Sequence, residues 1–186
     1  MPIELITPCL SALGMYKNAL KRGYSPNNLN PQHYAGLELA HIETDPCDFI
    51  ATIDGSRNQQ QILDLARGSS TRFPGLRRWL MDDHTFIGSF NFRWNPNGTA
   101  LPDKVPGNIG YSVAPWLRNQ GYATRGLGLL LKEVRAMGLT QVDLSIEASN
   151  QASIKVALKC GAVLERIIEP SVFYPDSVEH RYGITL

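Results

Sequence analysis

The stretch WLRNQGYATRGLGLL, residues 116–130, joins an apolar run typical of a strand to a leucine-rich run typical of a helix. Residues 118–124 therefore lie at a helix N-terminus, where the first backbone N–H groups have no partner within the helix and the helix dipole adds positive potential. Gly121 and Ala123 leave the backbone open to a ligand, and Arg118 adds a fixed charge. This pattern is typical of a phosphate site, although an ordinary tight turn before a helix has the same composition.

Two other phosphate-binding patterns do not fit the sequence. A Walker-type loop requires G-x-x-x-x-G-K-[ST], and no lysine follows that spacing. A dinucleotide fingerprint requires its glycines ahead of the helix, whereas Gly126 and Gly128 fall inside the predicted helix. The stretch therefore predicts an anion site of another kind.

The chain downstream alternates between helical and strand periodicity. Leu127, Leu130, Leu131 and Val134 lie on one face of a helix that runs to Gly138. Alternating apolar residues then predict a strand, followed by a second helix and two more strands. The predicted ranges are a helix over 123–137, a strand over 141–147, a helix over 152–160, and strands over 162–170 and 179–186.

The chain upstream begins with a short strand and a helix, for which the predicted ranges are 3–6 and 10–22. The Pro- and Asn-rich residues 24–36 predict a loop or a broken helix, and Asp-Pro favours a helix that begins at Pro46. Residues 54–70 indicate only a turn, a glutamine run and one more helical turn.

Three strands precede the opening stretch: two around Asp82 and Asp83 within residues 76–94, and a third over 108–115. In the second of them four aromatic residues share one parity, which is typical of a strand with one buried face. These residues are Phe86, Phe90, Phe92 and Trp94. The chain shows no internal repeat or linker, and we expect one α/β domain over residues 1–186.

Two motifs together identify a family. Arg118, Gly121 and Ala123 form R-x-x-G-x-A after a strand, and Asn150 and Ser153 begin a second motif that ends at Lys159 and Gly161. The pair resembles the GNAT superfamily of acyl-CoA N-acyltransferases, most closely its branch of ribosomal-protein N-terminal acetyltransferases. The resemblance covers residues 73–186 and leaves residues 1–70 as a variable, acceptor-side region. It implies a mixed, mostly antiparallel twisted sheet of six to seven strands flanked by helices, with a splayed central strand pair.

The resemblance also implies how acetyl-CoA would bind as cosubstrate. The CoA diphosphate would lie on the backbone of the motif loop, and the pantetheine arm would pair with the preceding strand like an added strand. The Val113 N–H would donate to the acyl carbonyl and stabilise the oxyanion. The cofactor-binding residues implied are Ser112, Val113, Ala114, Arg118, Asn119, Gln120, Gly121, Tyr122, Ala123, Thr124, Asn150 and Ser153.

The implied reaction is direct attack of a primary amine, from a small molecule or a peptide, on the thioester. It needs a base, for which Glu147 at a strand end is the first candidate and Glu38 a second. Many relatives carry a tyrosine acid where this chain has Ala157, so the acid is another residue, such as Tyr174 or Tyr111, or is absent. A catalytically inactive CoA-binding or interaction module is the alternative.

The amino-acid composition limits the kinds of partner that the protein is expected to bind. With a net charge of +1, 43% hydrophobic and 19% charged residues, the chain has no overall field to gather nucleic acid. A ribosome- or RNA-associated role is suggested only by the arginines near residues 72–78 and by the resemblance to the ribosomal-protein branch. No signal peptide or membrane-spanning run is evident, and no pairing face for a homodimer stands out, although relatives often dimerise.

Cysteine and histidine usage points to a cytoplasmic protein without a bound metal. The three cysteines are widely spaced, which fits a reducing compartment and argues against disulfides or structural zinc. Cys160, near a helix C-terminus, is expected to be a buried thiol rather than a nucleophile. The four histidines are scattered without ligand spacing, so we predict no metal site.

Overall fold

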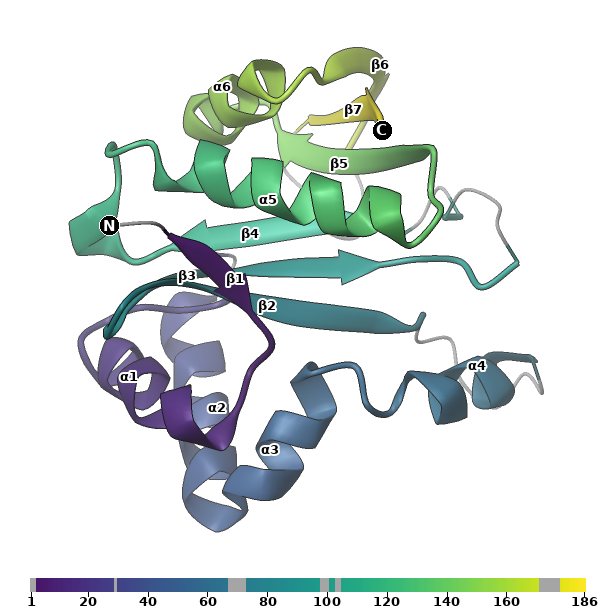
Figure 1. Cartoon of the computed structure of the whole chain (residues 1–186). Helices are drawn as coiled ribbons and strands as arrows, with labels where there is room; N and C mark the ends of the chain where they lie inside the picture. The colour runs from purple at the N-terminus through teal and green to yellow at the C-terminus, as the bar shows by residue number, and fades with distance from the viewer. Residues whose placement is uncertain (1–2, 29, 67–72, 98–100, 103–104, 171–177) are drawn as a thin grey trace.

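The computed structural model describes residues 3–28, 30–66, 73–97, 101–102, 105–170 and 178–186. Its elements are β1 (Glu4–Ile6), α1 (Leu10–Lys21), α2 (Pro31–Thr44), α3 (Pro46–Ile53), α4 (Asn58–Ala66), β2 (Gly75–Asp82), β3 (Thr85–Arg93), β4 (Ile109–Val113), the 3-10 turn η1 (Pro115–Leu117), α5 (Tyr122–Ala136), β5 (Gln141–Glu147), α6 (Gln151–Lys159), β6 (Val163–Ile168) and β7 (Glu179–Thr185) (Figure 1).

The strands form two antiparallel sheets, with the orders β1-β2-β3-β4 and β5-β7-β6. In Figure 1, β4 and β5 lie next to each other at the facing edges of the two sheets and point in the same direction. The expected mixed, mostly antiparallel fold with a splayed central strand pair is therefore confirmed, and β4 and β5 are that pair.

The two sheets are joined where β4 begins. The Asn108 side chain accepts from the Asp143 N–H at 2.8 Å and donates to the Arg93 carbonyl at 3.0 Å, so it ties β5 to the end of β3. A Cβ on Gly107 would lie 2.4 Å from the Asp143 carbonyl oxygen, so only glycine allows this close approach. β4 and β5 are joined at this end. Toward Val113, at the other end of β4, no backbone ladder pairs the described residues of the two strands.

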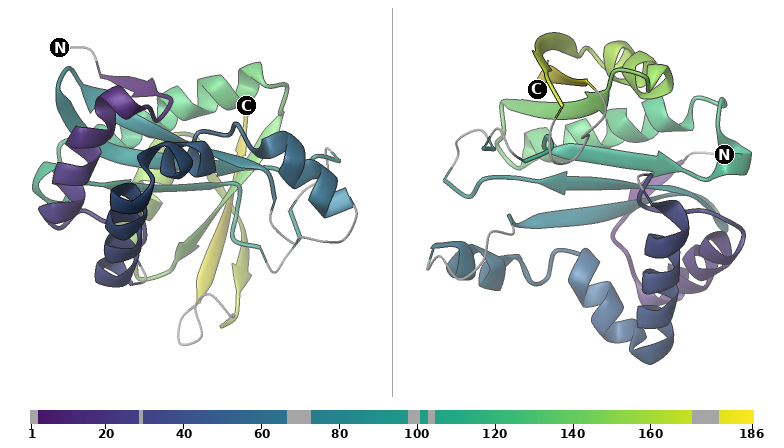
Figure 2. Two further views of the ribbon diagram at one scale, coloured as in Figure 1. Left: turned by 90° about the horizontal axis from the view of Figure 1, so that it is seen from below. Right: turned by 180° about the vertical axis from the view of Figure 1, so that it is seen from behind.

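Helices cover opposite faces of the four-stranded sheet, and each face has its own core (Figure 2). α1, α2 and α3 pack on one face around Tyr16, Phe49 and Trp79. α5 packs on the other face, where Leu127 and Leu130 are fully buried, and α6 packs beside α5 and on β5. The splayed edge of β4 therefore lies between two rigid layers.

The expectation that Phe86, Phe90, Phe92 and Trp94 share one face is wrong for Phe86. A β-bulge in β3 shifts the pairing with β2, so that Leu80 faces Gly88 while Met81 faces Phe86. The extra residue turns Phe86 into the core under α1, whereas Phe90 and Phe92 remain in the core under α5. The strand is also buried on both faces over most of its length rather than on one.

The N-terminal half is more helical than the sequence indicates. Residues 31–44 form the regular helix α2, which begins with Pro31 in its first turn, where a missing N–H costs nothing. Ile42 is its one buried residue, so the apolar pattern that would have revealed the helix is weak. The helix from Pro46 is confirmed as α3, and Asp45 caps it by accepting from the Asp48 N–H at 2.9 Å.

Among the described residues, each helix is too short or too polar to reach across a lipid bilayer.

Candidate functional site

A cleft of about 660 Å³ opens at the splayed end of β4. Its walls come from the end of β4, the loop and first turn that begin α5, and the length of α6, and it continues to the loop before α2 and the first residue of that helix. The lining residues are Asn28, Pro31, Tyr111, Ser112, Val113, Leu117, Arg118, Asn119, Gly121, Tyr122, Ala123, Thr124, Asn150, Ala152, Ser153, Lys155, Val156 and Lys159. Both sequence motifs therefore meet in one hollow.

The N-terminus of α5 opens into this cleft. Asn119 and Gly121 have positive φ angles of 62° and 80°, which turn the chain sharply into the helix. The first helical hydrogen bond runs from Arg125 N to the Gly121 carbonyl at 3.1 Å. No side chain caps this end of the helix. The N–H groups of residues 122–124 are thus left for a ligand, which is the arrangement that binds phosphate.

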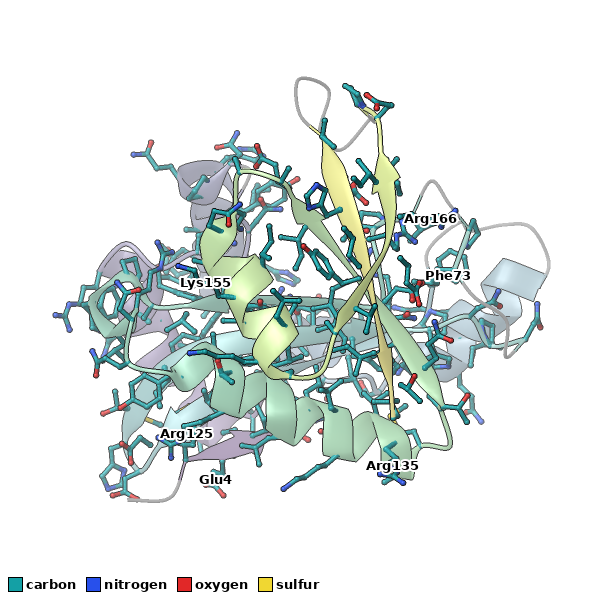
Figure 3. All side chains as sticks on the ribbon, turned by 90° about the horizontal axis from the view of Figure 1, so that it is seen from above. Glu4, Phe73, Arg125, Arg135, Lys155 and Arg166 are labelled. Carbon is teal, nitrogen blue, oxygen red and sulfur yellow. The ribbon has the colours of Figure 1, made fainter. Side chains whose placement is uncertain are left out.

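Three basic side chains line the cleft at this helix end, and a fourth, Arg125, lies close to Tyr122 on α5. Arg118, Lys155 and Lys159 line the cleft, and the Arg125 guanidinium carbon lies 5.9 Å from the centre of the Tyr122 ring. Figure 3 shows Lys155 on α6 and Arg125 on α5 at the same side of the view. Lys155, four residues before Lys159 on α6, is a candidate that the motifs do not include. Cations and helix dipole together favour an anion with more than one charge.

The edge of β4 presents the Val113 amide to the cleft. Two backbone hydrogen bonds tie β4 to β3: the Asn108 carbonyl accepts from the Arg93 N–H at 2.9 Å, and the Ala114 N–H donates to the Ile87 carbonyl at 2.8 Å. Backbone groups alternate in direction along an antiparallel strand, so the Val113 N–H points away from β3. The Val113 carbonyl, on the same edge, accepts from Arg118 Nε at 3.2 Å.

The other residues expected on this edge have different surroundings. Ser112 pairs with Ser89 of β3, and its main-chain groups point toward that strand. Ala114 is fully buried and lies outside the cleft lining, as does Gln120 of the phosphate loop. Among the residues 112–114, only the amide of Val113 is available to a ligand arm at the strand edge.

Tyr111 fastens the two walls of the cleft. Its hydroxyl donates to the Ser153 carbonyl in the first turn of α6 at 3.2 Å, and its ring stacks on Phe90 with centroids 5.6 Å apart. Burial raises the pKa of Tyr111 to about 12. The phenol therefore stays protonated at neutral pH, with its proton directed at a carbonyl rather than at the open space.

Asn150 caps α6, since its Oδ1 accepts from the Ser153 N–H at 3.1 Å. We expect Asn150→Ala to lower the free energy of unfolding by about 1 kcal/mol, because one donor at the helix end loses its partner. The same change should weaken CoA binding, since the first turn of α6 lines the cleft. Urea denaturation measures the first effect.

The matched control is Asn150→Ser, which keeps a capping oxygen and should restore the stability. Equal unfolding midpoints for Asn150→Ala and the unmodified protein would show that the cap contributes nothing.

The sequence candidates for acid and base are dispersed. Glu147 ends β5, where it is half-buried, pairs with Glu179 of β7 and lies outside the cleft lining. Tyr174 lies outside the described residues. Ala157 is fully buried in the core, so α6 offers no side chain to the cleft at that position.

Glu38 is not a free base, contrary to the second expectation. Its carboxylate accepts from Arg77 Nη1 at 2.8 Å and from the Tyr16 hydroxyl, in a largely buried cluster under β2. The partners lie 39 and 22 residues away, so the sequence alone does not reveal the cluster. The carboxylate is held in an ion pair and does not line the cleft.

Cys160 behaves as a thiol rather than a nucleophile. It is partly buried, its Sγ donates to the Thr124 carbonyl at 3.6 Å, and burial raises the pKa of the thiol. Among the described residues, no group of three His, Cys, Asp or Glu side chains is placed to hold a metal ion. A second hollow of about 830 Å³ beside Arg77 contains no residue of either motif.

A family model described as "Acetyltransferase (GNAT) domain" matches residues 28–163, well over half of the chain. The class of the protein is therefore plain: it is an acetyltransferase. The chain belongs to the GNAT acetyltransferase family, which confirms at the family level the expectation of an enzyme that uses acetyl-CoA as cosubstrate.

Among the solved structures that share this fold are three acetyltransferases. The microcin C7 self-immunity acetyltransferase MccE, in complex with acetyl-CoA and AMP, is 15% identical over 99% of this chain and 92% of its own, with a TM-score of 0.62. RimL, the ribosomal L7/L12 alpha-N-protein acetyltransferase with coenzyme A, is 16% identical over 99% and 94%, with a TM-score of 0.67. RimJ of Mycobacterium smegmatis is 16% identical over 98% and 81%, with a TM-score of 0.63. No curated protein matches the chain.

Proposed function

We propose that this protein transfers the acetyl group of acetyl-CoA to a primary amine, by direct attack within a complex of both substrates. One observation carries the proposal: the uncapped amides of α5 and the outward-facing Val113 N–H open into the same cleft. A cosubstrate that carries a diphosphate and, at the end of its pantetheine arm, a thioester needs both features. The solved relatives bound to CoA or acetyl-CoA support this assignment.

The diphosphate and the acyl carbonyl of the cosubstrate would each be bound by different groups of the cleft. The N–H groups of residues 122–124, with Lys155 and Lys159, would hold the diphosphate. The Val113 N–H would donate to the acyl carbonyl and strengthen that bond as the oxygen becomes negative, an effect worth on the order of 3 kcal/mol in other acyl transfers. Direct attack needs no covalent enzyme intermediate, and the thiol of Cys160 is not required.

The acceptor is a primary amine of a small molecule or of a peptide N-terminus. RimL is an alpha-N-protein acetyltransferase of ribosomal L7/L12, which supports the second class of acceptor. The immunity acetyltransferase MccE leaves the first class as a candidate. The cleft reaches the loop between α1 and α2 at Asn28 and Pro31, in the region that the sequence assigns to the acceptor.

Glu147 is the proposed base that deprotonates the acceptor ammonium. It lies at the end of β5 and on the face opposite α6, because its neighbour Ile146 points into the core under α6. We expect Glu147→Gln to lower kcat about 100-fold near neutral pH, a loss that a higher pH reduces as more of the amine is neutral in solution. A pH series of initial rates measures this; equal profiles for both proteins would remove Glu147 from the mechanism.

The function is tested by incubating the protein with acetyl-CoA and a panel of amines and terminal peptides while thiol release is measured. Release that requires both substrates supports the proposal. Failure to bind CoA in a calorimetric titration would end it.

Binding of acetyl-CoA without transfer to any amine would instead favour a non-catalytic CoA-binding module. Two observations support this alternative: a buried alanine, Ala157, stands at the position of the tyrosine acid, and the carboxylate of Glu38 is held in an ion pair.

A further inference from the structure

Three hydroxyl groups form a buried chain beside the oxyanion position. The Tyr24 Oη lies 2.6 Å from Ser89 Oγ and 2.7 Å from Ser112 Oγ. Tyr24 is 1% exposed, Ser89 is fully buried and Ser112 is 5% exposed. The tyrosine follows α1, whereas the serines face each other across β3 and β4. Polar groups so deeply buried are retained at a cost, and the structure satisfies each of them with another hydroxyl.

The series of three hydroxyl groups ends with Ser112 at the reaction cleft, on the side that the acceptor would approach. The side chains of Tyr111 and Val113 join the core under α5, so Ser112, between them, points to the opposite face, where Tyr24 meets it. Ser112 lines the cleft and precedes Val113, whose N–H faces the acyl carbonyl. Asn28, in the loop after Tyr24, lines the same cleft.

The hydroxyl chain can pass a proton but cannot hold a charge. Burial raises the pKa of Tyr24, so the phenol stays neutral at working pH. A central hydroxyl between two others donates to one and accepts from the other. Ser112 Oγ, which is in contact with Tyr24, keeps hydrogen-bonding capacity for a second partner, and it can exchange donor and acceptor roles as Tyr24 rotates its proton between the serines.

We propose that Ser112 is the proton-shuttling hydroxyl of the acetyl transfer, held in place by Tyr24; the proposal rests on the function proposed above. After the amine has added to the acyl carbon, its N–H bond breaks and the proton joins Ser112 Oγ. The serine gives its own proton to the departing sulfur, while the C–S bond breaks with its electrons on sulfur. An amide and a free thiol form, and the serine is unchanged.

The Tyr111 hydroxyl, which also belongs to the cleft lining, is less suited to this task. Tyr111 directs its proton at the Ser153 carbonyl, and burial raises its pKa to about 12. Ser112 lines the same cleft and directly precedes Val113, whose N–H would meet the acyl carbonyl.

The test compares Ser112→Ala with Ser89→Ala, a matched pair in which each variant removes one buried hydroxyl from Tyr24. We expect Ser112→Ala to lower kcat on the order of 100-fold with an unchanged KM for acetyl-CoA, since the phosphate contacts remain. Ser89→Ala leaves the Tyr24–Ser112 contact and should cost less than about tenfold. Ser112→Thr keeps the hydroxyl and should recover most of the rate, and Tyr24→Phe should fall between the two alanine variants.

Thermal unfolding and calorimetric CoA binding accompany the rates, so that misfolding is recognised. An equal decrease in kcat for the two alanine variants would assign the three hydroxyl groups a purely structural role and overturn the proposal. So would a threonine variant no better than alanine. If the unmodified protein binds CoA but transfers acetyl to no amine, the proposed function fails as well; if it transfers and Ser112→Ala transfers equally, only the shuttle fails.

Discussion

Ala123→Asp should abolish CoA binding and leave the protein as stable as before or slightly more stable. A carboxylate in the first turn of α5 interacts favourably with the helix dipole, by about 0.3–1 kcal/mol. The same carboxylate would lie in the cleft where we place the diphosphate. At about 4 Å and an effective dielectric constant of about 20, one such repulsion costs about 4 kcal/mol. That corresponds to a loss of affinity on the order of a thousandfold.

The matched control is Ala123→Asn, which has nearly the same size and no charge. It should weaken CoA binding far less than Ala123→Asp, because only the steric part of the effect remains. Calorimetry gives the dissociation constants, and thermal unfolding gives the stabilities. Similar affinities for the two variants would mean that no phosphate approaches this helix end.

Gly126→Ala should destabilise the protein, whereas Gly128→Ala, two residues further along α5, should not. A Cβ on Gly126 would lie 2.2 Å from the ring of Phe90, which is fully buried. Overpacking of this kind costs about 1–3 kcal/mol. Gly128 has nothing within 4 Å of an added Cβ, so alanine there should stabilise the helix by about 0.5–1 kcal/mol.

Melting temperatures of the two variants should therefore shift in opposite directions, by about 2–4 °C for each kcal/mol in a chain of this size. Gly126→Ala should also disturb the cleft, since Phe90 stacks on Tyr111. A Gly126→Ala protein as stable as Gly128→Ala would show that α5 is less closely packed on β3 than the structure has it.

The local signals in the sequence predict the start of α5 and the residues that gather around it. Gly121 and Ala123 mark the start of α5 because their lack of side chains is itself the requirement for close approach of a ligand. The two motifs predicted residues that the structure brings into one cleft, although binding to them remains a prediction. The strand periodicities likewise placed β4 and β5, because each has one face in the core under α5.

Features that depend on distant partners were out of reach. Tyr24 and Ser112 are 88 residues apart, and nothing in either segment indicates that they meet. Glu38 looked available as a base because its ion pair with Arg77 arises only from tertiary packing. The predicted face for the Phe86 side chain is wrong because strict alternation assumes a regular pleat, and the bulge in β3 breaks the pleat.

The amide proton shifts of residues 122–124 in nitrogen-15-labelled protein, followed during titration with CoA, report most directly on the open end of α5. We predict that these signals move downfield as each N–H donates to a phosphate oxygen. Saturable binding of CoA with these three signals unmoved, and shifts confined to another surface, would contradict the placement of the diphosphate on this helix.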